Sequence, residues 1–225
     1  MKAILSCYTD LGNPSAPKGL EPEWLGLELM KKRELSKVIC RGTSNKRPIL
    51  LPKVYIVNPI PLGNKIPQTL TFVQQTASLF PSRYISQNYF FDYFAQKHIK
   101  DADVLVCEMP SLIRQMRAAK EQGMKTFVFA TSAHISFVKK LMTKEYKKYG
   151  LEYKGDRLFE QNNIDSYKEA DMIFARSRFT RMTLEKSGIP KNKIFHMPIQ
   201  VFTDLNRFMP AKKKDDIFRA IYVGQ

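Results

Sequence analysis

The chain has 225 residues, of which 44% are hydrophobic and 12% aromatic, so it can bury a core of its own and disorder is not expected. Its 37 Lys and Arg residues against 21 Asp and Glu give a net charge of +16, which attracts polyanions: nucleic acid, anionic lipid or phosphorylated small molecules. The three cysteines are an odd number without the spacing of a zinc motif, which argues against a disulfide framework and predicts buried, reduced thiols in a cytosolic protein. They are Cys7, Cys40 and Cys107.

Two apolar stretches in the first part of the chain do not have the properties of a targeting or membrane-spanning segment. Ala3–Tyr8 is shorter than the core of a signal peptide, and Asp10 follows it. Ile49–Leu62 contains Lys53 and several prolines, which a bilayer-spanning helix would not tolerate. We therefore expect a cytoplasmic protein that at most sits on a membrane surface.

Short apolar runs alternate with helical segments along the whole chain. Ala3–Tyr8 is the first expected strand, and a loop rich in glycine and proline follows it. A helix is expected from about Glu21 to Leu35, because acidic residues open this segment and basic residues close it, as the helix dipole favours. Further strands are expected at Lys37–Cys40, Val54–Val57, Asp103–Cys107 and Thr126–Ala130. Further helices are expected at Thr69–Leu79, Arg83–Ile99, Ser111–Glu121, Ser136–Tyr149 and Asp156–Glu169.

The stretch after these elements holds one more strand–helix–strand unit. Met172–Ala175 is a short apolar strand, and Ser177 is a candidate N-cap for the helix that follows. Gly188 and Pro190 end that helix, and Ile194–Met197 is the next strand. Such a short unit predicts a right-handed parallel crossover. Together with the alternation upstream, it predicts an α/β fold: a doubly wound, mostly parallel Rossmann-like sheet with helices on both faces.

The same stretch, Ala170–Pro210, resembles the end of the first domain in retaining glycosyltransferases of the GT-B fold (glycosyl transferases group 1, family 4-like). Those enzymes often have alanine-aspartate before a short strand, a serine before the helix, glycine-x-proline after it, and an aspartate shortly before phenylalanine-x-proline. The matching residues, in order, are Ala170, Asp171, Ser177, Phe179, Gly188, Pro190, Pro198, Asp204, Phe208 and Pro210. The family's proline-asparagine-glycine-valine-aspartate is not kept, because Ile199–Thr203 intervenes without a glycine, so the turn before Asp204 is expected to differ.

The resemblance also implies a domain organisation. Residues 1–209 would form the acceptor-side domain, residues 210–218, with the charge run Lys212–Asp216, a linker, and residues 219–225 the first strand of a donor-binding domain. That second domain is expected to follow in the same chain or to be a separate chain. The resemblance implies transfer of a sugar from a nucleotide-sugar donor to a glycan or lipid-linked acceptor. With its active site incomplete, this chain alone is expected to have little or no activity.

Open α/β sheets bind ligands beyond the carboxyl ends of their strands, so residues that follow strands are the candidates for a site. Lys18-Gly19-Leu20-Glu21 follows the first strand and half matches the glycine-glycine-x-glutamate of many GT-B enzymes. The resemblance implies that Lys18 and Gly19 approach the donor diphosphate, where free backbone N–H groups at a helix start would favour an anion. An ordinary flexible turn is the alternative.

His134 follows the strand Thr126–Ala130, at a place where GT-B enzymes often carry a histidine near the sugar and acceptor. The resemblance implies a catalytic role, in which a neutral imidazole hydrogen-bonds a sugar hydroxyl or a developing charge. A surface or helix-capping histidine is the alternative. Glu108 also follows a strand and would orient an acceptor hydroxyl, although without the resemblance it would be an ordinary exposed acid. The other expected acceptor-binding residues are Ser111, Thr131 and Ser132.

No metal site is expected, because the sequence has no paired histidines and no cysteine cluster. The resemblance likewise implies a transfer that needs no metal and no cofactor, with the nucleotide sugar as co-substrate. In such enzymes positive groups and helix dipoles stabilise the departing nucleotide diphosphate.

The segment Phe137–Tyr149 has an apolar half and a lysine-rich half on a helical wheel. Such a helix can lie on anionic lipid, or it can pack its apolar half on the sheet and leave the lysines in water. Packing on the sheet is the expectation, because helices that flank a sheet are amphipathic by necessity and Glu145 lies in the apolar half. Peripheral membrane contact is the alternative.

A different class of function is a non-enzymatic Rossmann-like module that holds nucleic acid or another polyanion through its net charge of +16. The basic residues are spread along the whole chain, however, and no recognised nucleic-acid motif is present. The aromatic residues between Tyr89 and Phe94 are expected to be core rather than stacking residues. Nucleic acid is therefore not an expected partner.

Overall fold

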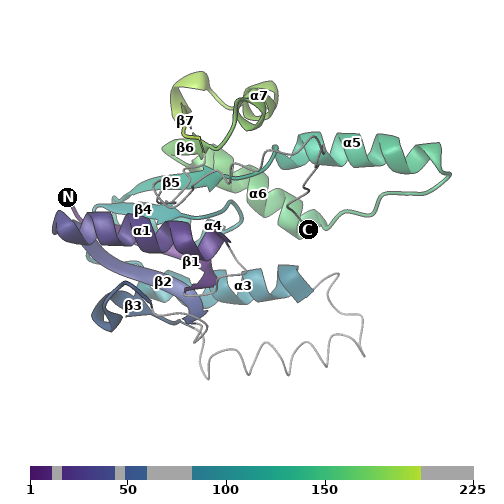
Figure 1. Ribbon diagram of the computed structural model, residues 1–225. Helices are drawn as coiled ribbons and strands as arrows, with labels where there is room; N and C mark the ends of the chain where they lie inside the picture. The colour runs from purple at the N-terminus through teal and green to yellow at the C-terminus, as the bar shows by residue number, and fades with distance from the viewer. Residues whose placement is uncertain (12–16, 44–48, 60–82, 199–225) are drawn as a thin grey trace, which may run out of the picture.

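The computed structural model describes residues 1–11, 17–43, 49–59 and 83–198, and Figure 1 shows their arrangement. They form one sheet of seven strands in the order β3-β2-β1-β4-β5-β6-β7, and every neighbouring pair is parallel. The predicted doubly wound, Rossmann-like fold is confirmed. The strands are β1 (Ala3–Leu11), β2 (Leu35–Thr43), β3 (Ile56–Val57), β4 (Val104–Cys107), β5 (Lys125–Ala130), β6 (Met172–Ala175) and β7 (Ile194–His196).

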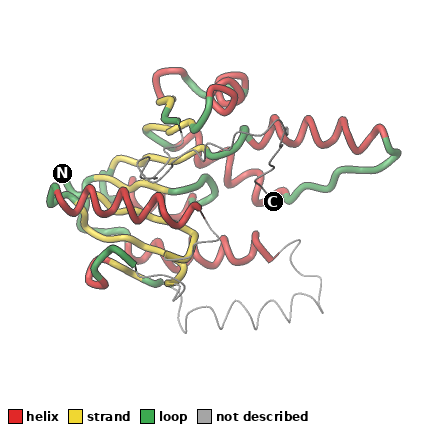
Figure 2. The backbone as a smooth tube through the Cα atoms, in the orientation of Figure 1, coloured by secondary structure: helices red, strands yellow, loops and turns green. Residues whose placement is uncertain are grey.

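Helices connect the strands and lie on both faces of the sheet, as Figure 2 shows. The α-helices are α1 (Pro17–Lys31), α3 (Arg83–Ala95), α4 (Ile113–Glu121), α5 (Ile135–Lys148), α6 (Arg157–Glu169) and α7 (Arg178–Lys186). The short 3₁₀ helices are η1 (Lys53–Tyr55), η2 (Gln96–His98) and η3 (Lys191–Lys193).

The strands carry apolar residues on both sides because each side meets a different set of helices. Leu5 and Val106 belong to a core shared with α1. Their neighbours Ile4 and Leu105 point the other way, into a second core with α3, α4, α6 and α7. This alternation follows from the period of two in a strand, and two covered faces explain why the strands are apolar almost throughout.

The unit β6–α7–β7 is built as the sequence predicts. The Ser177 side chain accepts a hydrogen bond from the backbone N–H of Thr180 at 3.0 Å, which caps α7. Gly188 has a φ of +87°, a conformation that glycine adopts without strain, and it follows the end of the helix. β6 and β7 then pair in parallel, with Ile173 opposite Ile194.

The boundaries of the first helix differ from the prediction. It runs from Pro17 to Lys31 rather than from about Glu21 to Leu35. Proline suits the first helical position, where the N–H that it lacks would have no intrahelical partner. At the other end Arg33 has a φ of +58°, and Leu35 already pairs with Ala3 in the sheet. Tertiary pairing therefore overrides the helical pattern.

Three other predictions change or stay open. Of the expected strand Val54–Val57, only the last two residues pair in the sheet, and η1 precedes them. Of the aromatic residues in α3, Phe91 is fully buried whereas Tyr93 is 40% exposed, so the helix is only partly core. The expected helix Thr69–Leu79, the linker and the expected final strand Ile221–Val223 lie outside the described residues.

The expectation that Phe137–Tyr149 packs on the sheet is wrong. No residue of α5 is buried, and Figure 1 shows the helix projecting away from the sheet. An amphipathic pattern predicts a helix here, but it does not distinguish a helix that covers a sheet from one whose apolar half stays exposed. In the described part of the chain, no helix combines the length and the hydropathy needed to cross a membrane.

The three cysteines are buried and carry free thiols, as the sequence predicts. Burial raises the pKa of Cys40 to about 12 and raises the pKa of Cys7 and of Cys107 well above the usual range of a thiol. The thiolate is the reactive form, so each thiol is protected both by its protonation and by its burial.

We therefore expect the folded chain to show no thiol that reacts rapidly with Ellman's reagent near neutral pH. The unfolded chain should show all 3. The measurement is the absorbance of the released thionitrobenzoate, with and without denaturant. Rapid reaction of one thiol in the folded chain would contradict the burial of that cysteine.

Candidate functional site

The centre of the sheet is the point where the chain reverses its winding direction. β1 lies between β2 and β4, so the connections after β1 and after β4 leave toward opposite sides. In open α/β sheets this switch point, at the carboxyl ends of the strands, is where ligands bind. Ser6 pairs with Cys107 in the register of β1 and β4, and the backbone N–H of Glu108 donates to the Ser6 carbonyl at 2.8 Å. Glu108 is thus fixed beside the end of β1.

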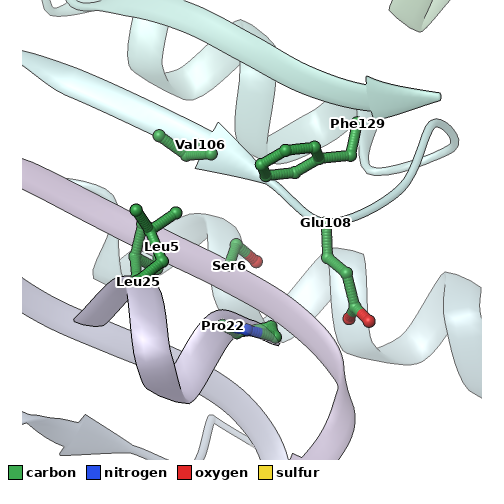
Figure 3. A pocket seen from close by; sticks show the side chains of 7 residues that line it. All are labelled: Leu5, Ser6, Pro22, Leu25, Val106, Glu108 and Phe129. Atoms are coloured by element: carbon green, nitrogen blue, oxygen red, sulfur yellow. The ribbon is translucent and has the colours of Figure 1, made fainter. Parts of the chain in front are cut away.

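The Glu108 carboxylate is buried and meets a hydroxyl from β1. Its residue is 7% exposed, and Thr9 Oγ1 donates to Glu108 Oε2 at 3.3 Å. The reading of Glu108 as an ordinary exposed acid, which the sequence alone supports, is therefore wrong. Figure 3 shows its side chain at the edge of a recess between the sheet and α1. The recess is lined by Leu5, Ser6, Pro22, Leu25, Val106, Glu108 and Phe129.

A buried hydrogen-bond chain supports this end of β1 from the opposite face of the sheet. Ser6 Oγ donates to Gln115 Oε1 at 2.6 Å, and Gln115 Nε2 donates to Asp92 Oδ1 at 3.2 Å. Asp92, on α3, also accepts the backbone N–H groups of Arg114 and Gln115 at 3.0 and 3.2 Å. It caps α4 from another helix, because Leu112 at the cap position has no side chain that could do so.

Asp92 is a carboxylate whose burial raises its pKa to about 6, against the opposing effect of the backbone N–H groups that it accepts. A pKa above the value in the unfolded chain means that the folded state binds the proton more tightly. The stability from this group is then fully present below about pH 4 and is lost as the pH rises through about 6.

Relative to Asp92→Asn, the wild-type chain should therefore lose roughly 3 kcal/mol of unfolding free energy between about pH 4 and pH 7. The measurement is urea unfolding of both chains across this range, and the difference between their free energies isolates Asp92 from the other carboxylates. A free energy of unfolding for the wild type minus that for Asp92→Asn that stays constant with pH, or that rises toward pH 7, would contradict the raised pKa.

Ser111 lies in the loop that follows Glu108, and other parts of the fold hold it. Its backbone φ of +91° is unusual for a residue other than glycine. Asn88 Nδ2 donates to its hydroxyl at 3.0 Å, and its backbone N–H donates to Ser166 Oγ at 3.1 Å. Ser111 is thus in the same loop as Glu108, with its backbone and hydroxyl engaged within the protein.

His134 lies beyond the end of β5 as the N-cap of α5. Its Nδ1 accepts the backbone N–H of Ser136 at 3.2 Å, and its own backbone N–H donates to Thr183 Oγ1 at 3.0 Å. The ring lies 5.4 Å from that of Tyr167, and burial lowers the pKa of the imidazole. These contacts are those of the helix-capping alternative. The neutral ring carries its proton on Nε2, because Nδ1 accepts a hydrogen bond.

The remaining predicted residues lie along the same edge of the sheet. Thr131 and Ser132 are exposed in the loop between β5 and α5. Lys18 and Gly19 lie in the first turn of α1, after its start rather than before it, and the Lys18 side chain is outside the described part of the structure. Since β1, β4 and β5 are neighbours, the fold brings the segments after them to one edge.

Sequence reasoning missed several residues of this edge. Arg41 lies in β2, beyond the end of the expected strand Lys37–Cys40, and its guanidinium makes two hydrogen bonds to the Asp10 carboxylate, at 3.1 and 2.7 Å. Asp92 and Gln115 were also missed, because nothing local in the sequence relates them to Ser6. Within the described ranges, no group of three or more His, Cys, Asp or Glu residues could hold a metal ion. Asp101 and Asp103 are spaced as Asp-x-Asp, but they lie before β4, and Asp103 accepts the backbone N–H of Lys2 at 2.6 Å.

No protein-family model matches the chain, and no curated protein matches it in sequence. Solved structures do match. The lipopolysaccharide outer core galactosyltransferase WaaB has a TM-score of 0.50 and 12% identity, covering 89% of this chain and 46% of that protein. UDP-GlcNAc 2-epimerase from Methanocaldococcus jannaschii has a TM-score of 0.48 and 17% identity, covering 87% and 45%. A ugt transferase from Siraitia grosvenorii, solved with UDP, has a TM-score of 0.43 and 13% identity, covering 83% and 48%.

This chain therefore spans about half the length of the proteins that it matches. At 12% identity, the likeness to WaaB is a likeness of fold. It supports the GT-B fold that the stretch Ala170–Pro210 resembles. The chain thus has the doubly wound, Rossmann-like fold, and the match to WaaB is one of fold alone.

Proposed function

We propose that the chain is the acceptor-side domain of a GT-B-type glycosyltransferase, which moves a sugar from a nucleotide-sugar donor to a glycan or lipid-linked acceptor with retention. The observation that carries this proposal is the Glu108 carboxylate, buried at the switch point of the sheet and joined there to Thr9. A carboxylate in such a place accepts a hydrogen bond from a hydroxyl more strongly than a neutral group would, and so can orient it for attack.

The proposal gives a role to five of the predicted residues, and leaves out Ser111, whose hydroxyl accepts from Asn88, and Lys18, whose side chain is outside the described structure. Glu108 orients the attacking hydroxyl of the acceptor, while the exposed hydroxyls of Thr131 and Ser132 bind neighbouring acceptor groups. His134 donates from Nε2 to the sugar, because its Nδ1 already accepts the N–H of Ser136. The first turn of α1, with Gly19, directs its backbone N–H groups at the donor diphosphate. A donor-binding domain supplies the rest.

The test is a transfer assay on the gene product that contains this chain, with a donor-binding domain present. Radiolabelled UDP- and GDP-sugars are offered separately, together with a glycan and lipid extract from the source cells and with EDTA. Label from one donor should enter the acceptor fraction, and the nucleotide diphosphate should be released in equal amount. Residues 1–225 alone should give little or no transfer.

Two outcomes would overturn the proposal. One is conversion of a nucleotide sugar to an epimer in the absence of any acceptor, which would make the protein an epimerase. The other is substantial transfer by residues 1–225 alone, because the proposal requires a second domain. Chromatography of the nucleotide-sugar pool separates these products from those of a transferase.

A further inference from the structure

Helix α5 stands apart from the cores that hold the other helices. None of its residues is buried, and Figure 1 shows it extending away from the sheet, with the chain returning toward α6. A helix in this position usually exposes polar residues all round. This one does not: Leu141 is 48% exposed, and the following turn exposes 79% of Tyr149 and 62% of Leu151.

A groove of about 680 Å³ lies between α5 and the end of α7. Phe137 and Leu141 give it an apolar lining, and the Phe137 ring makes an edge contact with Phe179 at 5.6 Å. Lys140 and Lys144 come from α5, and Lys186 comes from the last turn of α7. Three ammonium groups thus surround an apolar surface.

Among the residues that the structure describes, the three lysines that line this groove differ from some other lysines of α5 in their ion pairing. Two other lysines of α5 are paired: Lys139 with Glu160 at 2.7 Å and Lys148 with Glu145 at 2.8 Å. In the same part of the chain, no ion pair engages Lys140, Lys144 or Lys186. Their charges are available to a partner, on a chain that already carries +16.

The combination of exposed apolar side chains with lysines selects the kind of partner. A nucleic-acid backbone would satisfy the lysines but would leave Leu141 and Leu151 without an apolar environment. The surface of an anionic bilayer takes both, because lipid phosphates meet the ammonium groups while apolar side chains enter the boundary with the acyl chains. The long aliphatic stem of a lysine can also lie along an apolar surface while its ammonium group stays at the level of the lipid phosphates.

We propose that the face formed by α5 and the end of α7, with Lys140, Lys144, Lys186 and Leu141, docks the protein on an anionic phospholipid bilayer. Residues 1–225 should then float with vesicles of phosphatidylcholine that contain about 30 mol% phosphatidylglycerol, and not with phosphatidylcholine alone. The binding should weaken steeply toward about 0.5 M salt, because screening shortens the range of the attraction.

Two triple variants distinguish binding through this face from attraction by the net charge of the whole chain. Lys140→Glu, Lys144→Glu and Lys186→Glu together should weaken the partition coefficient about 100-fold or more, since each lysine near an anionic surface contributes about fivefold. The matched control reverses three exposed lysines, Lys32 in the turn after α1, Lys53 in η1 and Lys120 in α4, which lowers the net charge equally and should keep most of the binding. Leu141→Ser should weaken binding about tenfold without changing the charge.

The proposal is overturned if both triple variants lose binding equally, because the attraction would then be a property of net charge alone. It is also overturned if the chain ignores anionic vesicles but binds RNA or DNA through the same three lysines in a gel shift. All the substituted residues are exposed, so circular dichroism and the unfolding midpoint should match the wild type and exclude misfolding as the cause.

Discussion

Replacing Glu108 with glutamine should lower kcat/KM for sugar transfer about 100-fold or more. Glutamine keeps the shape of the side chain and an oxygen that can accept from Thr9, but it removes the charge that orients the acceptor hydroxyl in the proposed function. The loss should appear mainly in kcat, because the oriented hydroxyl matters most in the transition state. The measurement is initial-rate kinetics on the gene product that contains this chain, with the proposed donor-binding domain present.

Glu121→Gln is the matched control, because Glu121 is an exposed glutamate at the end of α4. It makes the same chemical change away from the recess and should leave kcat/KM within about twofold of the wild type. Full activity of Glu108→Gln, with that control also unchanged, would remove Glu108 from the proposed site. An unfolding midpoint equal to that of the wild type would show that any loss is not a loss of folding.

Replacing Tyr167 with alanine should lower the free energy of unfolding by about 3–5 kcal/mol. Tyr167 is 1% exposed and lies in the core shared by α3, α4, α6 and α7, so its removal leaves a cavity. Its ring also lies 5.4 Å from that of His134, and its loss removes one wall that holds the imidazole. The measurement is urea unfolding followed by circular dichroism.

Tyr149→Ala provides the comparison, because Tyr149 is 79% exposed and should cost less than about 0.5 kcal/mol. Similar losses for both tyrosines would contradict the burial of Tyr167. A large loss for Tyr167 alone would confirm that α6 is anchored in this core.

The sequence predicts the sheet well because the strands are buried on two faces. A short apolar run such as Met172–Ala175 predicts a buried strand, because it is too short for a helix. Ser177 marks the start of α7 by a local hydrogen bond, and Gly188 marks its end by a positive φ. Helix α1 was misplaced by four residues at both ends, because the pairing of Leu35 with Ala3 is a long-range contact. Boundaries set by distant partners leave no local pattern.

The candidate site was predictable only in outline. The strand-end rule selects Glu108 and His134, and the fold does place both at the carboxyl edge. The rule does not show that His134 caps α5, or that Ser6 joins Gln115 across 109 residues of sequence and Gln115 joins Asp92 across 23. The projection of α5 was also out of reach, because the same amphipathic pattern suits a packed and an unpacked helix.

The pairing of β1 with β4 joins two segments that are far apart in the sequence, which affects the order in which the chain folds. Ala3 lies opposite Val104, so this pairing closes a loop of about 100 residues, at an entropic cost of roughly 4 kcal/mol. β1, α1 and β2 can associate early, because their contacts are local in sequence. The recess beside Glu108 is lined by residues as far along the chain as Phe129, so it can form only after that residue has been synthesised, and we expect a slow folding phase that creates the recess.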